Sequence, residues 1–256
     1  MFDRFVFSDL KGKRVLVTGG STGIGAAVVS AFAQQGARVA IHFNESHAAA
    51  AALQSQYPEN TVLVHGDLGA PGVGTQVVDD ASRLLGGLDG IINNAGGMLG
   101  RVQTTEVSAE HFDRVLDLNA KSLWEASVAA HRHLVASRGG FIINTTSIAA
   151  RNGGGGGAVL YAAAKAFVSS LTRGQAKEFV KDRIRVNAVA PGLIQTPFHD
   201  RYTSAEIMAA QRMTIPMGRE GTPEECVGAF LFLASEAMSG YITGQVIEVN
   251  GGQLMP

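Results

Sequence analysis

The chain has 256 residues, of which 46% are apolar and 17% are charged, and this composition suits one globular domain with a large buried core. The 21 basic residues nearly balance the 22 acidic ones, so no basic surface for nucleic acid or an anionic membrane is expected. The single cysteine, Cys226, excludes an intramolecular disulfide and favours a reducing, cytoplasmic compartment. Glycine supplies 32 residues, which indicates tight turns and close approach of the backbone to a ligand.

Targeting and metal-binding signals are not found in the sequence. The segment Met1–Phe7 contains Asp3 and has no long apolar stretch before a cleavage site, so no secretory signal is predicted. No apolar run reaches the roughly 18 residues that a membrane helix needs. Seven scattered histidines and one cysteine make no metal cluster, and His131 and His133 face different sides of a predicted helix.

Short runs of β-branched residues alternate with longer segments of helical periodicity along the whole chain. The predicted strands are Arg14–Thr18, Arg38–Phe43, Thr61–His65, Gly90–Asn93, Gly140–Ser147, Arg183–Ala190 and Val246–Val249. The strands are continuously apolar, as expected for parallel strands that are covered on both faces. The alternation predicts an α/β protein with a doubly wound parallel sheet, a single-domain Rossmann fold over residues 1–256.

Two stretches interrupt the alternation. The five glycines Gly153–Gly157 are too short for a linker between domains and predict a mobile surface loop. Residues 196–222 follow the sixth predicted strand, on the side where open α/β sheets bind ligands, so a substrate lid is one interpretation. A plain surface excursion is an equal alternative, in which His199, Arg201 and Tyr202 are solvated loop residues.

A glycine-rich turn from Thr18 to Gly25 follows the first predicted strand and leads into a helix. Glycines there permit a tight turn and let backbone N–H groups approach a pyrophosphate, which the positive end of the helix also attracts. No Gly-Lys-Ser/Thr sequence ends the turn, so a nucleoside triphosphatase is disfavoured. A plain tight turn is the alternative, but the strand before it and the helix after it favour a dinucleotide.

This turn and later motifs resemble the short-chain dehydrogenase/reductase family over essentially the whole chain. The matching residues after the turn are Asp67, Asn93-Asn94-Ala95-Gly96, Asn119, Ser147, Tyr161-x-x-x-Lys165, Pro191-Gly192, Thr196 and Asn250-Gly251-Gly252. One departure is that Ser147 precedes Tyr161 by 14 residues, one more than is usual in the family. The glycine run lies in this interval and offers a place for the extra residue.

The resemblance implies four catalytic residues. Tyr161 would exchange a proton with the substrate oxygen, and Ser147 would hydrogen-bond that oxygen. Lys165 would hold the nicotinamide ribose and, together with an oxidised nicotinamide, lower the pKa of Tyr161 toward about 7, since nearby positive charge favours the phenolate. The spacing of four places Tyr161 and Lys165 on one helix face. Asn119 would position a water in a proton relay; alone, it more often bonds a backbone carbonyl in its helix.

The resemblance also implies which residues hold a nicotinamide dinucleotide. They are Gly19, Ser21, Thr22, Gly23, Ile24, Gly25, Asn44, Ser46, Asp67, Leu68, Asn93, Ala95, Gly96, Tyr161, Lys165, Pro191, Gly192, Ile194 and Thr196. Asp67 would accept a hydrogen bond from the adenine amino group; the alternative is a turn residue, because Gly66-Asp67-Leu68-Gly69 also has the composition of a turn.

The end of the second predicted strand bears on the choice of cofactor. An acidic residue there would bind the ribose diol and repel a 2′-phosphate, but Phe43 stands at this position. The local sequence Ile41–Ser46 resembles family members that use NADP(H), in which Asn44 and Ser46 could donate hydrogen bonds to the phosphate. Nearby Glu45 argues against it, as does Thr22 at a position where many such members carry arginine. NADP(H) is therefore slightly favoured over NAD(H).

The predicted function is an NAD(P)-dependent oxidoreductase that transfers a hydride between the cofactor and a small secondary alcohol or ketone. The pattern resembles 3-oxoacyl-carrier-protein reductase-like members, a group that includes sugar and polyol dehydrogenases. The alternative is a catalytically silent dinucleotide-binding regulatory protein, which the intact catalytic set disfavours. The resemblance also implies a homotetramer, with helices from Ser108–Arg138 and Ala158–Val180 pairing between subunits.

Overall fold

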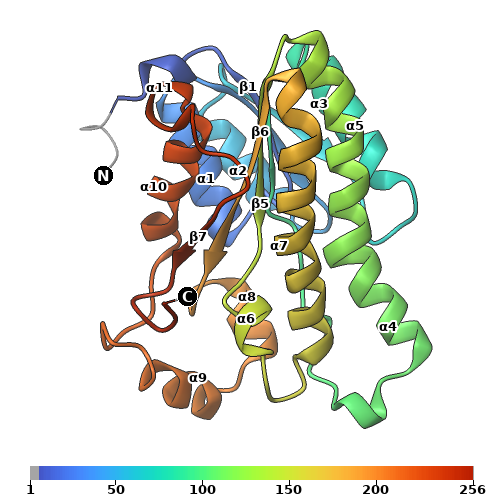
Figure 1. Ribbon diagram of the computed structural model, residues 1–256, viewed down its shortest axis with the longest axis vertical. Coiled ribbons are helices and arrows are strands. Elements are labelled where there is room, and N and C mark those ends of the chain that lie inside the picture. The colour runs from blue at the N-terminus through green and yellow to red at the C-terminus, as the bar shows by residue number, and fades with distance from the viewer. Residues whose placement is uncertain (1–5, 256) are drawn as a thin grey trace.

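The computed structural model describes residues 6–255; residues 1–5, part of the segment in which no secretory signal is predicted, lie outside the described residues. Seven parallel strands form one sheet in the order β3-β2-β1-β4-β5-β6-β7 (Figure 1). The strands are β1 Arg14–Val17, β2 Arg38–Phe43, β3 Thr61–His65, β4 Gly90–Asn93, β5 Gly140–Thr145, β6 Ile184–Pro191 and β7 Val246–Val249. All seven predicted strands are confirmed, and their ends differ from the prediction by two residues or fewer.

Helices cover both faces of the sheet. They are α1 Gly23–Gln34, α2 His47–Gln56, α3 Val73–Leu85, α4 Ala109–Leu116, α5 Ser122–Ala136, α6 Ala149–Asn152, α7 Val159–Phe179, α8 Pro197–Tyr202, α9 Ala205–Arg212, α10 Pro223–Ala234 and α11 Glu236–Ser239. Figure 1 shows α1 and α10 on one face and α3, α5 and α7 on the other. A π-helical turn, Asp117–Lys121, joins α4 to α5. The doubly wound α/β prediction is confirmed.

The continuously apolar strands supply two cores at once. In β1, Val15 and Val17 join the core beneath α1 and α10, whereas Leu16, between them, joins the core beneath α3 and α5. All three side chains are fully buried. Successive side chains of a strand point to opposite faces, and burying each aliphatic side chain contributes about 1.5–3 kcal/mol. A strand covered on both faces therefore has no polar alternation, as the sequence predicted.

The strand order reverses at β1. The chain runs outward from β1 to β2 and β3, then returns to pair β4 on the other side of β1. This reversal opens a crevice beyond the carboxyl ends of β1 and β4, where open α/β sheets bind ligands. Short helices α6 and α8 lie at this edge, with α9 farther out (Figure 1). The segment 196–222, which includes α8 and α9, thus lies on the ligand-binding side of the sheet.

Two further features concern the chain as a whole. Among residues 6–255, no helix combines the length and apolar character needed to cross a membrane. The glycines of Gly153–Gly157 all have positive φ, between 50° and 81°. Residues with a side chain rarely adopt this conformation, so the glycine run has a backbone reason for its composition.

Candidate active site

A cavity of about 710 Å³ lies along the carboxyl edge of the sheet. The predicted site residues that line it are Gly19, Ser21, Thr22, Gly23, Ile24, Asn44, Ser46, Asp67, Leu68, Ala95, Gly96, Ser147, Tyr161, Lys165, Pro191, Gly192, Ile194 and Thr196. Three predicted residues, Gly25, Asn93 and Asn119, do not line it. Segments distant in the sequence thus meet in one cavity. Within residues 6–255, no three His, Cys, Asp or Glu side chains gather as a metal site.

Ser147, Tyr161 and Lys165 meet at one end of this cavity. Ser147 lies just beyond β5, close enough to Tyr161 near the start of α7 for its side chain to lower the Tyr161 pKa. Lys165, one helical turn later, is 2% exposed, and its Nζ lies 5.7 Å from the centroid of the Tyr161 ring. Its ammonium donates a hydrogen bond of 2.9 Å to the carbonyl oxygen of Thr145 at the end of β5. The extra residue between Ser147 and Tyr161 therefore does not separate the two hydroxyls.

Burial shifts both ionisable groups toward their neutral forms. It raises the pKa of Tyr161 to about 12, and the nearby Ser147 side chain opposes the shift only in part. It lowers the pKa of Lys165 to about 8. The expected fall toward 7 depends on Lys165 together with an oxidised nicotinamide; the protein alone raises the tyrosine pKa, because the loss of water disfavours the phenolate. The protein's own groups keep the phenol protonated at neutral pH, the form that can donate a proton.

Asn119 lies in the π-helical turn between α4 and α5 and is 1% exposed. Its Nδ2 donates to the carbonyl oxygens of Gly97 (2.8 Å) and Val115 (2.9 Å), and its Oδ1 accepts from the Gly97 amide (3.0 Å). A Cβ atom at Gly96 would lie 2.7 Å from the Asn119 Oδ1 and 3.1 Å from the Lys165 Nζ. The side chain thus holds the 96–97 backbone against Lys165. Its proposed part in a proton relay stays a prediction.

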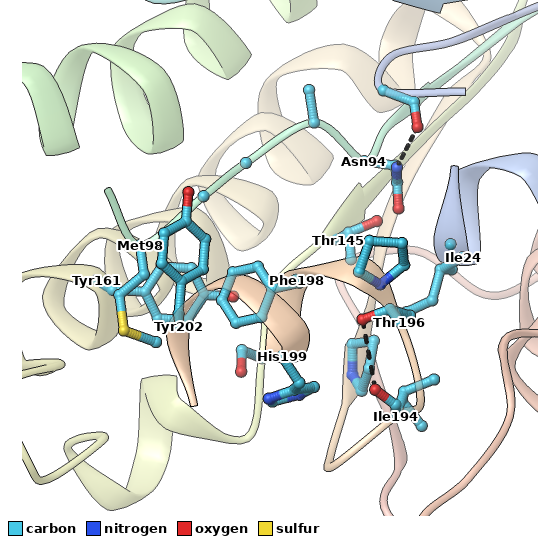
Figure 2. Close-up of a pocket in the computed structure, with 18 of the residues that line it drawn as sticks. Ile24, Asn94, Met98, Thr145, Tyr161, Ile194, Thr196, Phe198, His199 and Tyr202 are labelled. Atoms are coloured by element: carbon cyan, nitrogen blue, oxygen red, sulfur yellow. Dashed lines mark hydrogen bonds between the residues drawn. The ribbon is translucent and has the colours of Figure 1, made fainter. Parts of the chain in front are cut away.

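Asn93 is oriented differently from the prediction. Its side chain is 2% exposed and donates to Asn144 Oδ1 (2.9 Å) and Ser127 Oγ (3.1 Å) inside the sheet. The next residue, Asn94, lines the cavity instead, and its Nδ2 donates to the Gly19 carbonyl at 3.1 Å (Figure 2). Neighbouring residues at a strand end point in opposite directions, and the motif alone does not tell which one faces the ligand side.

The glycine turn fits the pyrophosphate of a dinucleotide. No side chain caps the N-terminus of α1 at Thr22, and no acidic residue lies in its first turn, so backbone N–H groups remain for an anion. A Cβ at Gly25 would lie 2.1 Å from the Gly19 carbonyl oxygen. Gly25 therefore acts by letting the helix pack against the turn, although it does not line the cavity.

His42, near the end of β2, is a functional residue that the sequence analysis did not single out. It is 2% exposed and lines the cavity floor. Its Nδ1 accepts from the Gly19 amide (3.0 Å), and its Nε2 bonds the Gly66 carbonyl oxygen (3.0 Å). These partners assign the neutral tautomer with the proton on Nε2. The available signal was a polar residue in an otherwise apolar strand, immediately before the ligand-binding edge.

The end of the cavity beside Tyr161, called here the substrate end, is covered by α8. The Phe198 ring lies 5.5 Å from the Tyr161 ring and 5.2 Å from the Tyr202 ring (Figure 2). His199 and Arg201 also line the cavity. His199 and Tyr202 are part-buried where α8 turns back over the catalytic group, so the interpretation as solvated loop residues is wrong for these two. Arg201 is exposed, in agreement with that interpretation.

Comparison with known proteins agrees with this geometry. Residues 19–253 match the family described as enoyl-(acyl carrier protein) reductase. The chain is 39% identical to General stress protein 39 of Bacillus subtilis, over 96% of this chain and 86% of that protein. It is 35% identical to a 3alpha-hydroxysteroid dehydrogenase of Mediterraneibacter gnavus, over 96% and 98%. A crystal structure of the NADH-dependent reductase A1-R′ complexed with NAD is similar, with a TM-score of 0.87 and 40% identity, over 98% and 100%.

The chain belongs to the short-chain dehydrogenase/reductase family. It is an NAD(P)-dependent oxidoreductase that interconverts secondary alcohols and ketones. The catalytically silent alternative receives no support from these relatives. The narrower resemblance to 3-oxoacyl-carrier-protein reductases is only hinted at, since the relatives carry names from several substrate classes.

We expect His42 to make folding sensitive to acid. Burial lowers its pKa from 6.5 to about 4, so between these values the unfolded chain binds a proton that the folded chain does not. Stability therefore falls as the pH drops through this window, by roughly 3 kcal/mol in all. His42→Gln removes the titration, so urea unfolding at pH 7 and pH 4.5 should show the wild type losing about 2 kcal/mol more than the variant. Equal losses would contradict the assignment.

Proposed function

We propose that Ser147, Tyr161 and Lys165 carry out the proton transfer of a reversible ketone reduction. The observation that supports this most strongly is that Ser147, Tyr161 and Lys165 line one cavity, which continues into an uncapped helix N-terminus suited to a dinucleotide. The nicotinamide, when bound, supplies or accepts the hydride. The predicted cofactor-binding residues that line the cavity would hold the cofactor, together with Asn94 and His42.

In the direction of reduction, Tyr161 donates its proton to the carbonyl oxygen, and the Ser147 hydroxyl hydrogen-bonds the same oxygen. The resulting phenolate is stabilised by Ser147 and by the Lys165 ammonium, which the Thr145 carbonyl orients. In the direction of oxidation the phenolate is the required base. Because the tyrosine pKa lies far above neutrality, oxidation should gain rate as the pH rises and reduction should not.

We propose a modest preference for NADP(H). No acidic side chain ends β2, and Asn44 and Ser46 line the cavity where a 2′-phosphate would lie. α2 begins at His47, and no side chain caps its N-terminus at Ser46, so its N–H groups and dipole favour an anion there. Against this, Glu45 lines the same place, and the similar reductase A1-R′ is described as NADH-dependent.

We propose that residues 196–222 form the substrate lid within a single domain. Phe198 and Tyr202 present aromatic rings at the substrate end and exclude water from Tyr161. The substrate itself would be a 3-oxoacyl thioester or a sugar or polyol. Steroid ketones should also be assayed as substrates, because one relative is named a hydroxysteroid dehydrogenase. We place the enzyme in the cytoplasm, because its one cysteine is free and buried.

We also propose a homotetramer. Large apolar side chains are exposed on α4, α5 and α7: Phe112, Trp124, Val128, Val159 and Phe167 are each 43–47% exposed. Exposed apolar side chains gathered on neighbouring helices are typical of subunit contacts. A tetramer has four times the 26.7 kDa mass of one chain, and light scattering measures it directly.

Tyr161→Phe removes the proton donor and keeps the ring. A positioned general acid contributes about 10²–10⁴-fold, so kcat/KM should fall by a factor in this range for the ketone that the wild type reduces fastest, among 3-oxoacyl thioesters, keto sugars and steroid ketones. The dissociation constant for NADPH, measured by fluorescence, should change little. Tyr241→Phe is the matched control, because Tyr241 is fully exposed. Unchanged turnover in Tyr161→Phe would refute the proton-transfer role; a wild type that binds NADPH but reduces no carbonyl would favour the silent alternative.

Phe43→Asp places a carboxylate where it repels a 2′-phosphate. The ratio of kcat/KM with NADPH to kcat/KM with NADH should fall by roughly tenfold or more, since a change of about 1.4 kcal/mol is tenfold. Phe43 is 6% exposed and packs between His47 and His65, so the substitution also disturbs packing. Phe43→Asn is the control for this effect and should move the ratio much less. Equal ratios in the two variants would mean that charge at this position does not select the cofactor.

The tetramer prediction is tested with Phe167→Lys. A charge on the exposed face of α7 should lower the mass in solution without unfolding the chain, because the side chain lies outside both cores. The exposed Lys177 on the same helix offers the control Lys177→Gln, which should leave the mass unchanged. A wild-type mass of one chain would contradict the prediction.

A further inference from the structure

Arg101 connects three segments around the substrate end. It lies in the loop between β4 and α4 and lines the cavity. Its Nε donates to the Tyr202 carbonyl oxygen (2.6 Å), and its Nη2 donates to Thr203 Oγ1 (3.2 Å), both at the C-terminal end of α8. Its Nη1 donates to the Gly156 carbonyl oxygen (3.0 Å) in the glycine run. One side chain thus joins the lid segment to the loop between Ser147 and Tyr161.

The surroundings of Arg101 indicate that its role is to hold these three hydrogen-bond acceptors in place. The structure gives it no carboxylate partner among residues 6–255, and its pKa is lowered by burial alone. A partly buried cation is costly unless its donors are satisfied, and here carbonyl and hydroxyl oxygens satisfy them. The planar guanidinium carries five N–H donors on three nitrogens in fixed directions, so it can reach three separated acceptors, whereas the three donors of a lysine share one rotating nitrogen.

The backbone beside Arg101 is attached to the same glycine run. The Val102 amide donates to the Gly157 carbonyl oxygen at 3.1 Å. A Cβ at Gly157 would lie 3.0 Å from the Arg101 carbonyl carbon, and Gly157 has a φ of 78°. The glycine run therefore lies directly against residues 101–102, and Arg101 spans from this fixed backbone to α8.

The rest of the lid segment has anchors of its own. Arg212 Nε donates to Glu220 Oε1 at 3.0 Å, and Glu220 is 5% exposed. Gln253 Nε2 donates to Thr214 Oγ1 at 2.7 Å. These contacts hold the part of the segment that follows α8. Losing Arg101 would therefore release the C-terminal end of α8 rather than the whole segment.

We propose that Arg101 is a positioning residue that holds α8 closed over the catalytic tyrosine, a role that rests on the function proposed above. By fixing the end of α8 at Tyr202 and Thr203, it keeps the Phe198 ring packed against Tyr161. The closed helix forms one wall of the substrate end and keeps water from the Tyr161 hydroxyl. The glycine turn and the ends of β2 and β3 lie elsewhere along the cavity, so cofactor binding does not depend on Arg101.

The experiment compares Arg101→Gln and Arg101→Lys with wild type, and Arg173→Gln serves as the matched control. Arg173 is exposed and bonds only the Ser169 carbonyl within its own helix. In Arg101→Gln, the KM for the ketone that the wild type reduces fastest, among 3-oxoacyl thioesters, keto sugars and steroid ketones, should rise tenfold or more, with kcat changed less than threefold and the NADPH dissociation constant changed less than twofold. Amide hydrogen exchange of residues 197–203 should accelerate tenfold or more. Arg101→Lys should behave like Arg101→Gln, because charge alone does not reproduce the three attachments.

Three results would overturn the proposal. Unchanged exchange in α8 would show that Arg101 does not hold it, and a lower melting temperature with an unchanged KM would show a merely structural role. Full recovery of the KM in Arg101→Lys would point to a charge contact with the substrate. If the wild type reduces no ketone, the proposed function fails, yet hydrogen exchange still reports whether Arg101 holds α8. The two failures are therefore distinguishable.

Discussion

The site depends on removing two ionisable side chains from water at the same place. Burial raises the pKa of Tyr161 to about 12 and lowers the pKa of Lys165 to about 8, so the ammonium is the more acidic of the two groups. At neutral pH the phenol is neutral and the ammonium is charged. This is the protonation state that ketone reduction requires. The charged Lys165 ammonium lies beside the Tyr161 ring, on which the phenolate would form.

The parallel sheet explains why the two groups can be buried together. β5 ends at Thr145, whose carbonyl oxygen accepts from the Lys165 ammonium, and Ser147 follows two residues later. The neighbouring strand ends are joined to one another by side chains, as His42 joins the glycine turn to Gly66 and Asn94 joins the β4 end to Gly19. Each of these contacts joins the carboxyl ends of neighbouring strands. The order of the strands in the sheet therefore also determines which site residues lie side by side.

The sequence predicted the fold from local signals and the site from its resemblance to the family. Apolar runs marked the seven strands, and the spacing of Tyr161 and Lys165 within one helix placed both on one face. Side-chain direction at a strand end has no such signal, so Asn93 was assigned where Asn94 lies. Arg101 was not singled out, because its partners lie 55 to 102 residues away. The rise in the Tyr161 pKa also escaped prediction, since burial depends on what α8 covers.

The extra residue between Ser147 and Tyr161 connects these features. All five glycines of the run adopt positive φ, and each glycine loses more conformational entropy on ordering than alanine, roughly 0.5–1 kcal/mol. An ordered run of this kind needs contacts that offset the cost, and Arg101 and Val102 supply two hydrogen bonds to it. The other hydrogen bonds of Arg101 go to the C-terminal end of α8. The longer loop therefore gives the arginine an acceptor opposite α8, the helix that closes the substrate end.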